Sequence, residues 1–176
     1  MRAAPMAFVL DPSRADDRRT IRDVSRITHH NEEAYVGALA VVVAIRGTMT
    51  GQASPEHLLE YVREFLPDSA TRDRVDALAP LSISVAEAGR RFGTSGHVVD
   101  AVPLAIYAAQ NLAHESAIDA VSSAVSAGGD TDTIASIAGQ IIGTRMGPDS
   151  LPSEVLQSIV EIGQIYGQVE QFSAAL

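Results

Sequence analysis

Residues 128–133, Gly-Gly-Asp-Thr-Asp-Thr, place two carboxylates and two hydroxyls directly before an apolar stretch. On a helix, residues i and i+2 point about 200° apart, so Asp130 and Asp132 could not share a target from inside one. In an extended or turn segment they can, and the two preceding glycines permit such a turn. With Thr133 at the start of the following helix, these oxygens could converge on a hard cation such as Mg²⁺, Mn²⁺ or Ca²⁺.

The same residues also have a purely structural explanation. Aspartate and threonine are common N-caps, so one aspartate could cap the helix while the other is solvated. Composition and spacing alone do not decide between a cation site and a cap.

The stretch that follows Asp132 is typical of a buried helix with two different faces. The first face is a stripe of apolar residues, which are Ile134, Ile137, Ala138, Ile141 and Ile142. The second face, formed by Ala135, Gly139 and Gly143, has almost no side chain. Because glycine inside a helix costs about 1 kcal/mol relative to alanine, we expect another backbone or a ligand to lie very close to this face.

The rest of the chain has a helical pattern almost throughout and predicts an all-α fold. Asn31 is the expected N-cap of a central helix over 32–46, which is apolar on nearly all sides. Ser54 followed by Pro55 predicts the start of a helix that stops at Pro67. Further helices are expected over residues 69–78, 84–92, 98–112, 114–127 and 152–172. The 176 residues are expected to form one domain without an internal repeat.

Composition narrows the class of protein. The formal net charge of −9 argues against nucleic acid as a partner, since a phosphate backbone is bound through a basic surface. The absence of cysteine excludes disulfides and thiolate metal sites. The longest apolar run, residues 38–45, is too short to span a bilayer. We therefore expect a cytoplasmic protein with no membrane or nucleic-acid partner.

Four segments resemble the ADP-ribosylglycohydrolase family, in the family's order and over nearly the whole chain. Residues 128–147, GGDTDTIASIAGQIIGTRMG, resemble its C-terminal signature. Residues 1–9, MRAAPMAFV, resemble the segment in which Arg2 would face the substrate. Residues 26–45, RITHHNEEAYVGALAVVVAI, resemble the family's Thr-His segment and core helix, and residues 93–109, GTSGHVVDAVPLAIYAA, resemble its glycine-rich loop.

The resemblance implies an all-α hydrolase that removes ADP-ribose from a protein side chain or a small ADP-ribosyl conjugate. It implies that Asp130 and Asp132 are catalytic and that, with Thr133, they are ligands of a two-metal site, usually for Mg²⁺ or Mn²⁺. Such a site holds a water and the ribose hydroxyls of ADP-ribose, and hydrolysis occurs at the ribose C1″ bond.

The resemblance also implies a set of substrate-binding residues. His29 would lie beside bound ADP-ribose, or alternatively it is a polar residue that caps the central helix. Gly93, Ser95, Gly96 and His97 would form the loop around the distal ribose and diphosphate, or alternatively a simple turn between helices. His97 stands where the family usually carries a tyrosine, and its flat ring can still stack.

A second set of family metal ligands, an acidic residue in a Gly-Asp-type segment and a Thr-Asp-Asp run, is not in this sequence. The chain is therefore expected to correspond to the C-terminal part of a family domain. Three oxygen ligands cannot satisfy two octahedral cations. We expect a homo-oligomer or a partner chain that carries the N-terminal segment. The alternative is a non-catalytic subunit for ADP-ribose or nucleotide binding, or for assembly.

Overall fold

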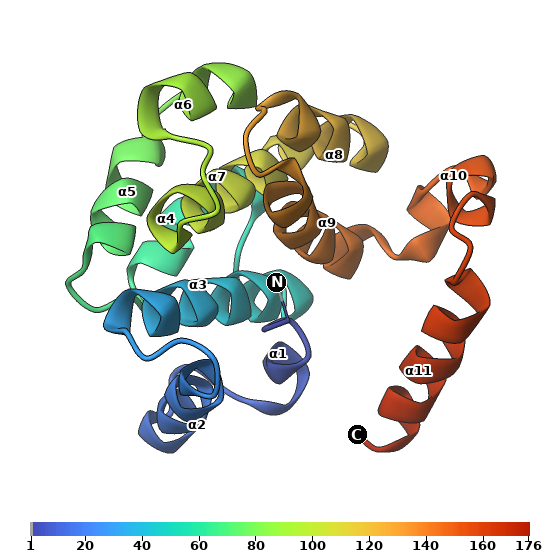
Figure 1. Ribbon diagram of the computed structural model, residues 1–176, viewed down its shortest axis with the longest axis horizontal. Coiled ribbons are helices and arrows are strands. Elements are labelled where there is room, and N and C mark those ends of the chain that lie inside the picture. The colour runs from blue at the N-terminus through green and yellow to red at the C-terminus, as the bar shows by residue number, and fades with distance from the viewer. Residues whose placement is uncertain (1) are drawn as a thin grey trace.

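Residues 2–176 are described by a computed structural model, and in that range the chain forms eleven α-helices, three short 3₁₀ turns and no strand (Figure 1). The α-helices are α1 Met6–Val9, α2 Ala15–Arg26, α3 Glu32–Met49, α4 Leu58–Arg63, α5 Ala70–Leu78, α6 Val85–Phe92, α7 Val98–Gln110, α8 Ala117–Ser126, α9 Thr131–Met146, α10 Ser153–Gln157 and α11 Ile162–Ala174. The 3₁₀ turns are η1 Pro55–His57, η2 Asn111–Ala113 and η3 Pro148–Ser150. The prediction of an all-α fold is confirmed. None of the described helices is both long enough and apolar enough to cross a bilayer.

Three helices, α3, α7 and α9, pack against one another and form the centre of the core. The expected central helix is confirmed and extends to Met49; its buried residues lie on nearly all sides of it. Helix α7 is buried at every position from Ala101 to Ala109, including Pro103 in its interior. Helix α9 contributes the predicted isoleucine stripe, which is buried.

Side-chain caps account for several of the helix starts. Asn31 Oδ1 accepts a hydrogen bond from the Ala34 N–H at 2.7 Å, as expected for the N-cap of α3. The predicted start at Ser54 and Pro55 is confirmed only in position: Pro55 opens a 3₁₀ turn and the Ser54 side chain makes no capping bond. Helix α4 follows and ends at Arg63, before the expected stop at Pro67. The Leu59 N–H instead donates to the Gln110 side chain at 3.1 Å, so a tertiary contact satisfies this end of α4.

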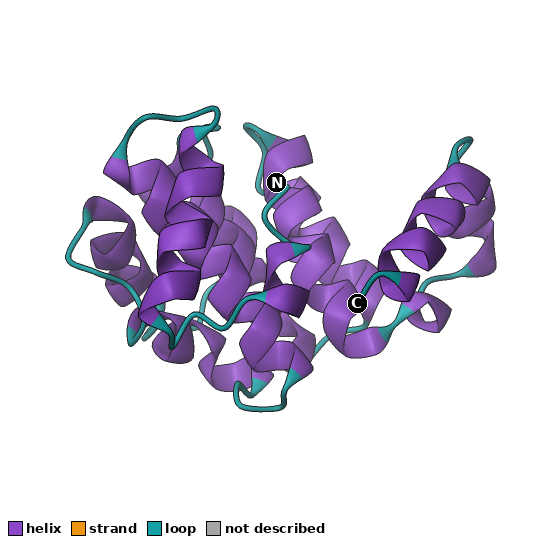
Figure 2. Ribbon diagram, turned by 90° about the horizontal axis from the view of Figure 1, so that it is seen from below, coloured by secondary structure: helices purple, strands orange, loops and turns teal. Residues whose placement is uncertain are grey.

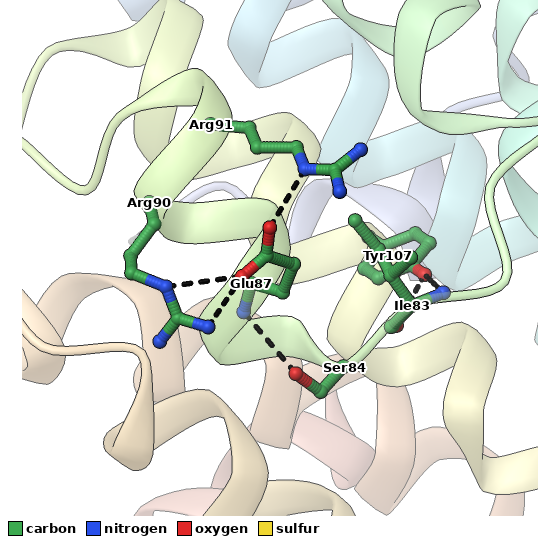
Figure 3. Close-up of polar contacts among 6 residues, drawn as sticks. All are labelled: Ile83, Ser84, Glu87, Arg90, Arg91 and Tyr107. Carbon is green, nitrogen blue, oxygen red and sulfur yellow. Dashed lines mark hydrogen bonds and ion pairs between the residues drawn. The ribbon is translucent and has the colours of Figure 1, made fainter.

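Helix α6 is fixed at its start by the side chain of Tyr107 in α7 (Figure 3). The Tyr107 hydroxyl donates to the Ile83 carbonyl at 2.6 Å and accepts from the Ile83 N–H at 3.0 Å. Ser84 then caps the helix by accepting from the Glu87 N–H at 3.2 Å. The Glu87 carboxylate also accepts hydrogen bonds from two arginines of the same helix, Arg90 and Arg91. Helix α6, which leads into residues 93–97, is therefore held in place at its N-terminal end.

The C-terminal helices α10 and α11 lie apart from the other helices (Figures 1 and 2). Neither helix has a fully buried residue. One aromatic contact ties α11 to the N-terminal region, since the Phe172 and Phe8 rings meet edge to face with their centroids 6.0 Å apart. The other large apolar side chains of α11 remain substantially exposed, and they include Ile165, Tyr166 and Val169.

The glycines of two core helices have different surroundings. At Gly37 in α3, a Cβ would overlap a methyl group of Val98, so α3 and the start of α7 are in close contact. At Gly139 and Gly143 no side chain or neighbouring helix of the described residues lies within 4 Å of a Cβ, so the expected approach of another backbone is not found within this chain, and that of a ligand stays a prediction. The isoleucine stripe of α9 faces the core, and the glycine face points away from it.

We predict opposite effects for alanine at Gly37 and at Gly139. Gly139→Ala should stabilise the protein by about 0.5–1 kcal/mol, because it removes a flexible residue from a helix with free space around it. Gly37→Ala should destabilise it, since overpacking typically costs about 1–3 kcal/mol and the β-branched Val98 has little rotamer freedom to move away. Urea unfolding of both variants measures the difference. Equal stability of Gly37→Ala and Gly139→Ala would contradict the close contact between α3 and α7, since both variants share the gain from alanine in a helix.

Candidate functional site

Two loops that are distant in sequence meet at one end of α7 and α9. They are the 93–97 loop, between α6 and α7, and the 128–130 loop, between α8 and α9. The Asp130 N–H donates a hydrogen bond to the Thr94 carbonyl at 2.8 Å. Gly129 is so close to Thr94 that a Cβ there would overlap the Thr94 carbonyl oxygen. The structure thus brings together two segments that sequence patterns singled out separately.

The Asp130 carboxylate packs directly on the 93–97 loop. A Cβ at Gly96 would overlap Asp130 Oδ2, so only glycine leaves room for the carboxylate in this position. Gly128 and Gly129 have φ angles of +78° and +70°, a region that side chains with a Cβ rarely adopt. Two consecutive left-handed residues therefore turn the chain so that Asp130 reaches Gly96 while its N–H reaches Thr94.

Asp130 and Asp132 lie on either side of the helix start. Helix α9 begins at Thr131, two residues earlier than the expected start at Thr133, and Asp130 is the N-cap with φ −80° and ψ 66°. Asp132 therefore lies inside the first turn, and the expectation of a non-helical Asp132 was wrong. The two side chains still come within hydrogen-bonding reach, because the Asp130 backbone is outside the helix.

Hydrogen bonds hold the pKa of Asp132 below its usual range. The main one involves the Asp130 side chain, and the next is donated by the Thr133 N–H, while slight desolvation acts in the opposite direction. Asp130 itself makes no side-chain capping bond. Two adjacent carboxylates repel each other unless they share a proton or bind a cation between them. The two carboxylates therefore begin helix α9 and could also bind a cation.

The donor set fits a hard cation only in part. Asp130, Asp132 and Thr133 supply oxygen atoms, which Mg²⁺ and Mn²⁺ prefer. Within residues 2–176, however, no group of three or more histidine, aspartate and glutamate side chains is placed to hold a metal ion. These residues could therefore provide one side of a coordination shell, and the remaining ligands would have to come from water, substrate or another segment.

The polar side chains of the 93–97 loop are exposed and partly organised. The Ser95 hydroxyl accepts from the His97 N–H at 3.2 Å. His97 is the N-cap of α7, where Nδ1 accepts from the Val99 N–H at a long 3.4 Å. The loop joins helices α6 and α7, as expected for the alternative of a simple turn. The exposed imidazole ring of His97 is free to contact a ligand.

Glu33 ties the start of α3 to the start of α5 beside this loop. Its carboxylate accepts from the Thr71 hydroxyl at 2.6 Å and from the Ala70 and Thr71 N–H groups at 2.8 and 3.1 Å. Partial burial raises the pKa of Glu33, but these hydrogen bonds outweigh it, and nearby His97 lowers the pKa further. The charge of Glu33 therefore lies close to the imidazole of the 93–97 loop.

His29 lies before the first turn of α3, in an exposed position. Its Nδ1 is 2.8 Å from the Thr28 hydroxyl oxygen, which also accepts from the Arg2 guanidinium at 2.7 Å. Thr28 thereby joins two residues that the family resemblance places at the substrate, and its role as a bridge could not be read from the sequence. The capping alternative for His29 was wrong, because Asn31 caps α3. In the part of the chain that the structure describes, no hydrogen bond connects His29 to either loop.

The chain belongs to the ADP-ribosylglycohydrolase family, whose family model matches residues 1–176. Among curated proteins, it is 32% identical over 147 residues to an uncharacterized protein of Archaeoglobus fulgidus, a match that covers 82% of this chain and 48% of that protein. It is 25% identical over 174 residues to the human ADP-ribosylhydrolase ARH3, a match that covers 81% of this chain and 48% of ARH3. The chain thus spans about half the length of the curated relatives it matches.

We predict different costs for alanine at the two glycines of the 128–130 loop. Gly128→Ala places a side chain in free space, so it should cost only the left-handed backbone penalty of about 1–2 kcal/mol. Gly129→Ala carries the same penalty and also displaces the Thr94 carbonyl, so it should cost clearly more. Chemical unfolding measures both variants, and the Asp130 amide signal in NMR spectra should shift further in Gly129→Ala. Equal costs and equal shifts would contradict the contact between the two loops.

Proposed function

We propose that this chain forms one side of a metal-dependent hydrolase site that removes ADP-ribose from a protein side chain or a small ADP-ribosyl conjugate. One observation carries the proposal: the Asp130 carboxylate lies against the glycine-rich 93–97 loop and is adjacent to that of Asp132. Family membership and the similarity to ARH3 support the class of reaction.

Asp130, Asp132 and Thr133 would hold Mg²⁺ or Mn²⁺ at the start of α9. A bound ion of this kind supplies Lewis-acid polarisation and lowers the pKa of its water. The protein fixes these ligands because α9 is anchored through its buried isoleucine stripe, and because the 93–97 loop restrains the Asp130 carboxylate from the other side.

The 93–97 loop would bind the diphosphate and distal ribose of ADP-ribose. Ser95 and Gly96 give it exposed backbone and a polar side chain, the half-buried Gly93 supplies the turn that leads into them, and backbone N–H groups in such loops can bind phosphate oxygens. His97 presents a flat ring for stacking. Thr28 orients the ring of His29, which would contact the ligand from the α3 side.

The remaining metal ligands would come from outside this set of residues. Asp132 is exposed and Asp130 is half-buried, and the relatives that match this chain are about twice its length. We propose that either a further segment of a longer protein or a second chain completes the site. The exposed apolar side chains of α11 offer such a segment a surface to pack on.

A second candidate function is binding of ADP-ribose without turnover. The incomplete donor set favours it, because two carboxylates and one hydroxyl are too few for two octahedral ions. The two candidates share the ligand and differ in whether the C1″ bond is hydrolysed.

We predict that Asp132→Ala abolishes Mn²⁺ binding while helicity stays nearly unchanged. A carboxylate in the first turn of a helix contributes only about 0.3–1 kcal/mol through the helix dipole, so the helix should survive without it. Asp119→Ala is a matched control, since Asp119 is also an exposed aspartate in the first turn of a helix, α8, but lies outside the two loops. Calorimetric titration with MnCl₂ and circular dichroism measure the two properties. Retained Mn²⁺ affinity in Asp132→Ala would refute the site assignment.

We further predict that the chain binds ADP-ribose more tightly than adenine or ribose 5-phosphate, because the loop and the two histidines would contact both ends of the ligand. Calorimetric titration with and without Mn²⁺ measures binding, and release of ADP-ribose from an ADP-ribosylated peptide measures turnover. Turnover with Mg²⁺ supports the hydrolase, and binding without turnover supports the second candidate. No heat with ADP-ribose under either condition contradicts both.

A further inference from the structure

The carboxylate of Asp100 lies where three elements meet. It belongs to the first turn of α7, and its side chain is 22% exposed. Oδ1 accepts from an Arg74 guanidinium nitrogen of α5 at 3.0 Å, and Oδ2 accepts from the Ser95 hydroxyl at 2.6 Å. Because both oxygens already have protein partners, Asp100 is suited to holding the 93–97 loop and not to binding a ligand.

The ion pair between Arg74 and Asp100 also fixes the beginning of the 93–97 loop. The Arg74 guanidinium donates to the Phe92 carbonyl, the last residue of α6. Gly93 follows with φ +103°, and a Cβ there would come within 2.8 Å of the Asp100 carboxylate. Phe92, Gly93 and Ser95 are thus held against one ion pair between α5 and α7.

Asp130 in turn is held by the other residues of this loop. Its N–H donates to the Thr94 carbonyl, and its carboxylate packs on Gly96. The 93–97 loop therefore contacts Asp100 through Gly93 and Ser95, and it contacts Asp130 through Thr94 and Gly96. Through it, a charge pair on α5 and α7 can determine where a carboxylate at the start of α9 lies.

We propose that Asp100, paired with Arg74, is a positioning residue that sets the placement of Asp130 relative to the 93–97 loop. Its importance for catalysis rests on the function proposed above, whereas the mechanical coupling between the loops does not. The coupling has a direct observable, the protection of the Asp130 amide, because that N–H is hydrogen-bonded to a loop whose shape depends on Asp100.

Hydrogen exchange followed by NMR tests the coupling in the whole chain. Asp100→Ala removes both contacts, and we expect the Asp130 amide to exchange about tenfold faster through easier local opening. Ser95→Ala removes one contact and should produce a smaller acceleration. Amides in the middle of α3 should keep their protection, which distinguishes repositioning of the loop from general destabilisation.

Asp76→Ala is the matched control. Asp76 pairs with Arg63 across α4 and α5, so it is also one partner of an arginine–aspartate pair between helices, but it is away from both loops. This variant should leave the Asp130 amide unchanged. If Asp100→Ala does not fold, Asp100→Asn and Ser95→Ala replace it, since each removes only part of the contacts. Unchanged exchange of Asp130 in the folded variants overturns the proposal.

Titration with ADP-ribose separates this proposal from the proposed function. If the parent chain binds ADP-ribose, Asp100→Asn should weaken binding by about tenfold, because the 93–97 loop must then be reordered when the ligand binds, and Asp76→Ala should not. Unchanged affinity in Asp100→Asn overturns the positioning role at the ligand. A parent chain that does not bind ADP-ribose contradicts the proposed function. Hydrogen exchange of the Asp130 amide still tests the coupling between the loops in that case.

Discussion

The hydrogen bond from the Asp130 N–H to the Thr94 carbonyl joins two connections that are 36 residues apart in sequence, and the organisation of the candidate site depends on it. It forms because α7 and α9 pack side by side through buried faces, so that their N-terminal ends lie together. At that shared end the backbones come too close for side chains, and glycines stand at the contacts. The polar groups on the outside of the contact, Ser95, His97 and Asp132, are then held by a rigid frame although they are exposed themselves.

Much of the helical framework could be predicted from local patterns. A side chain that caps its own helix acts over three residues, so Asn31 was identified correctly as the start of α3. The start of α4 was not predicted in the same way, because its Leu59 N–H finds Gln110, a residue 51 positions away, and a local rule does not include that partner. Periodicity likewise shows which residues of α9 share a face. It does not show which face meets another helix, and for this reason the backbone contact expected at the glycine stripe is absent from the described residues.

The residues of the candidate site that follow from local composition could be predicted, and those that act through distant partners could not. The composition of residues 128–133 indicated a convergence of carboxylates, and the structure places Asp130 and Asp132 together, although the helix starts earlier than the pattern suggested. Thr28 and Asp100 gave no signal, since each acts through partners about 26 residues away, Arg2 in one case and Arg74 in the other. Such pairings exist only once the helices have packed.

The charge balance of the chain explains why the Asp130–Asp132 pair favours a bound cation. With 22 acidic and 13 basic side chains, the chain is already strongly negative, and the Asp130–Asp132 pair adds a local repulsion that no cation of the described residues offsets by a salt bridge. Arg74, which holds the 93–97 loop, is paired with Asp100. Because the half-buried guanidinium of Arg74 positions the loop, while the adjacent Asp130 and Asp132 carboxylates have no salt-bridge partner among the described residues, the pair is arranged to receive positive charge from outside the chain.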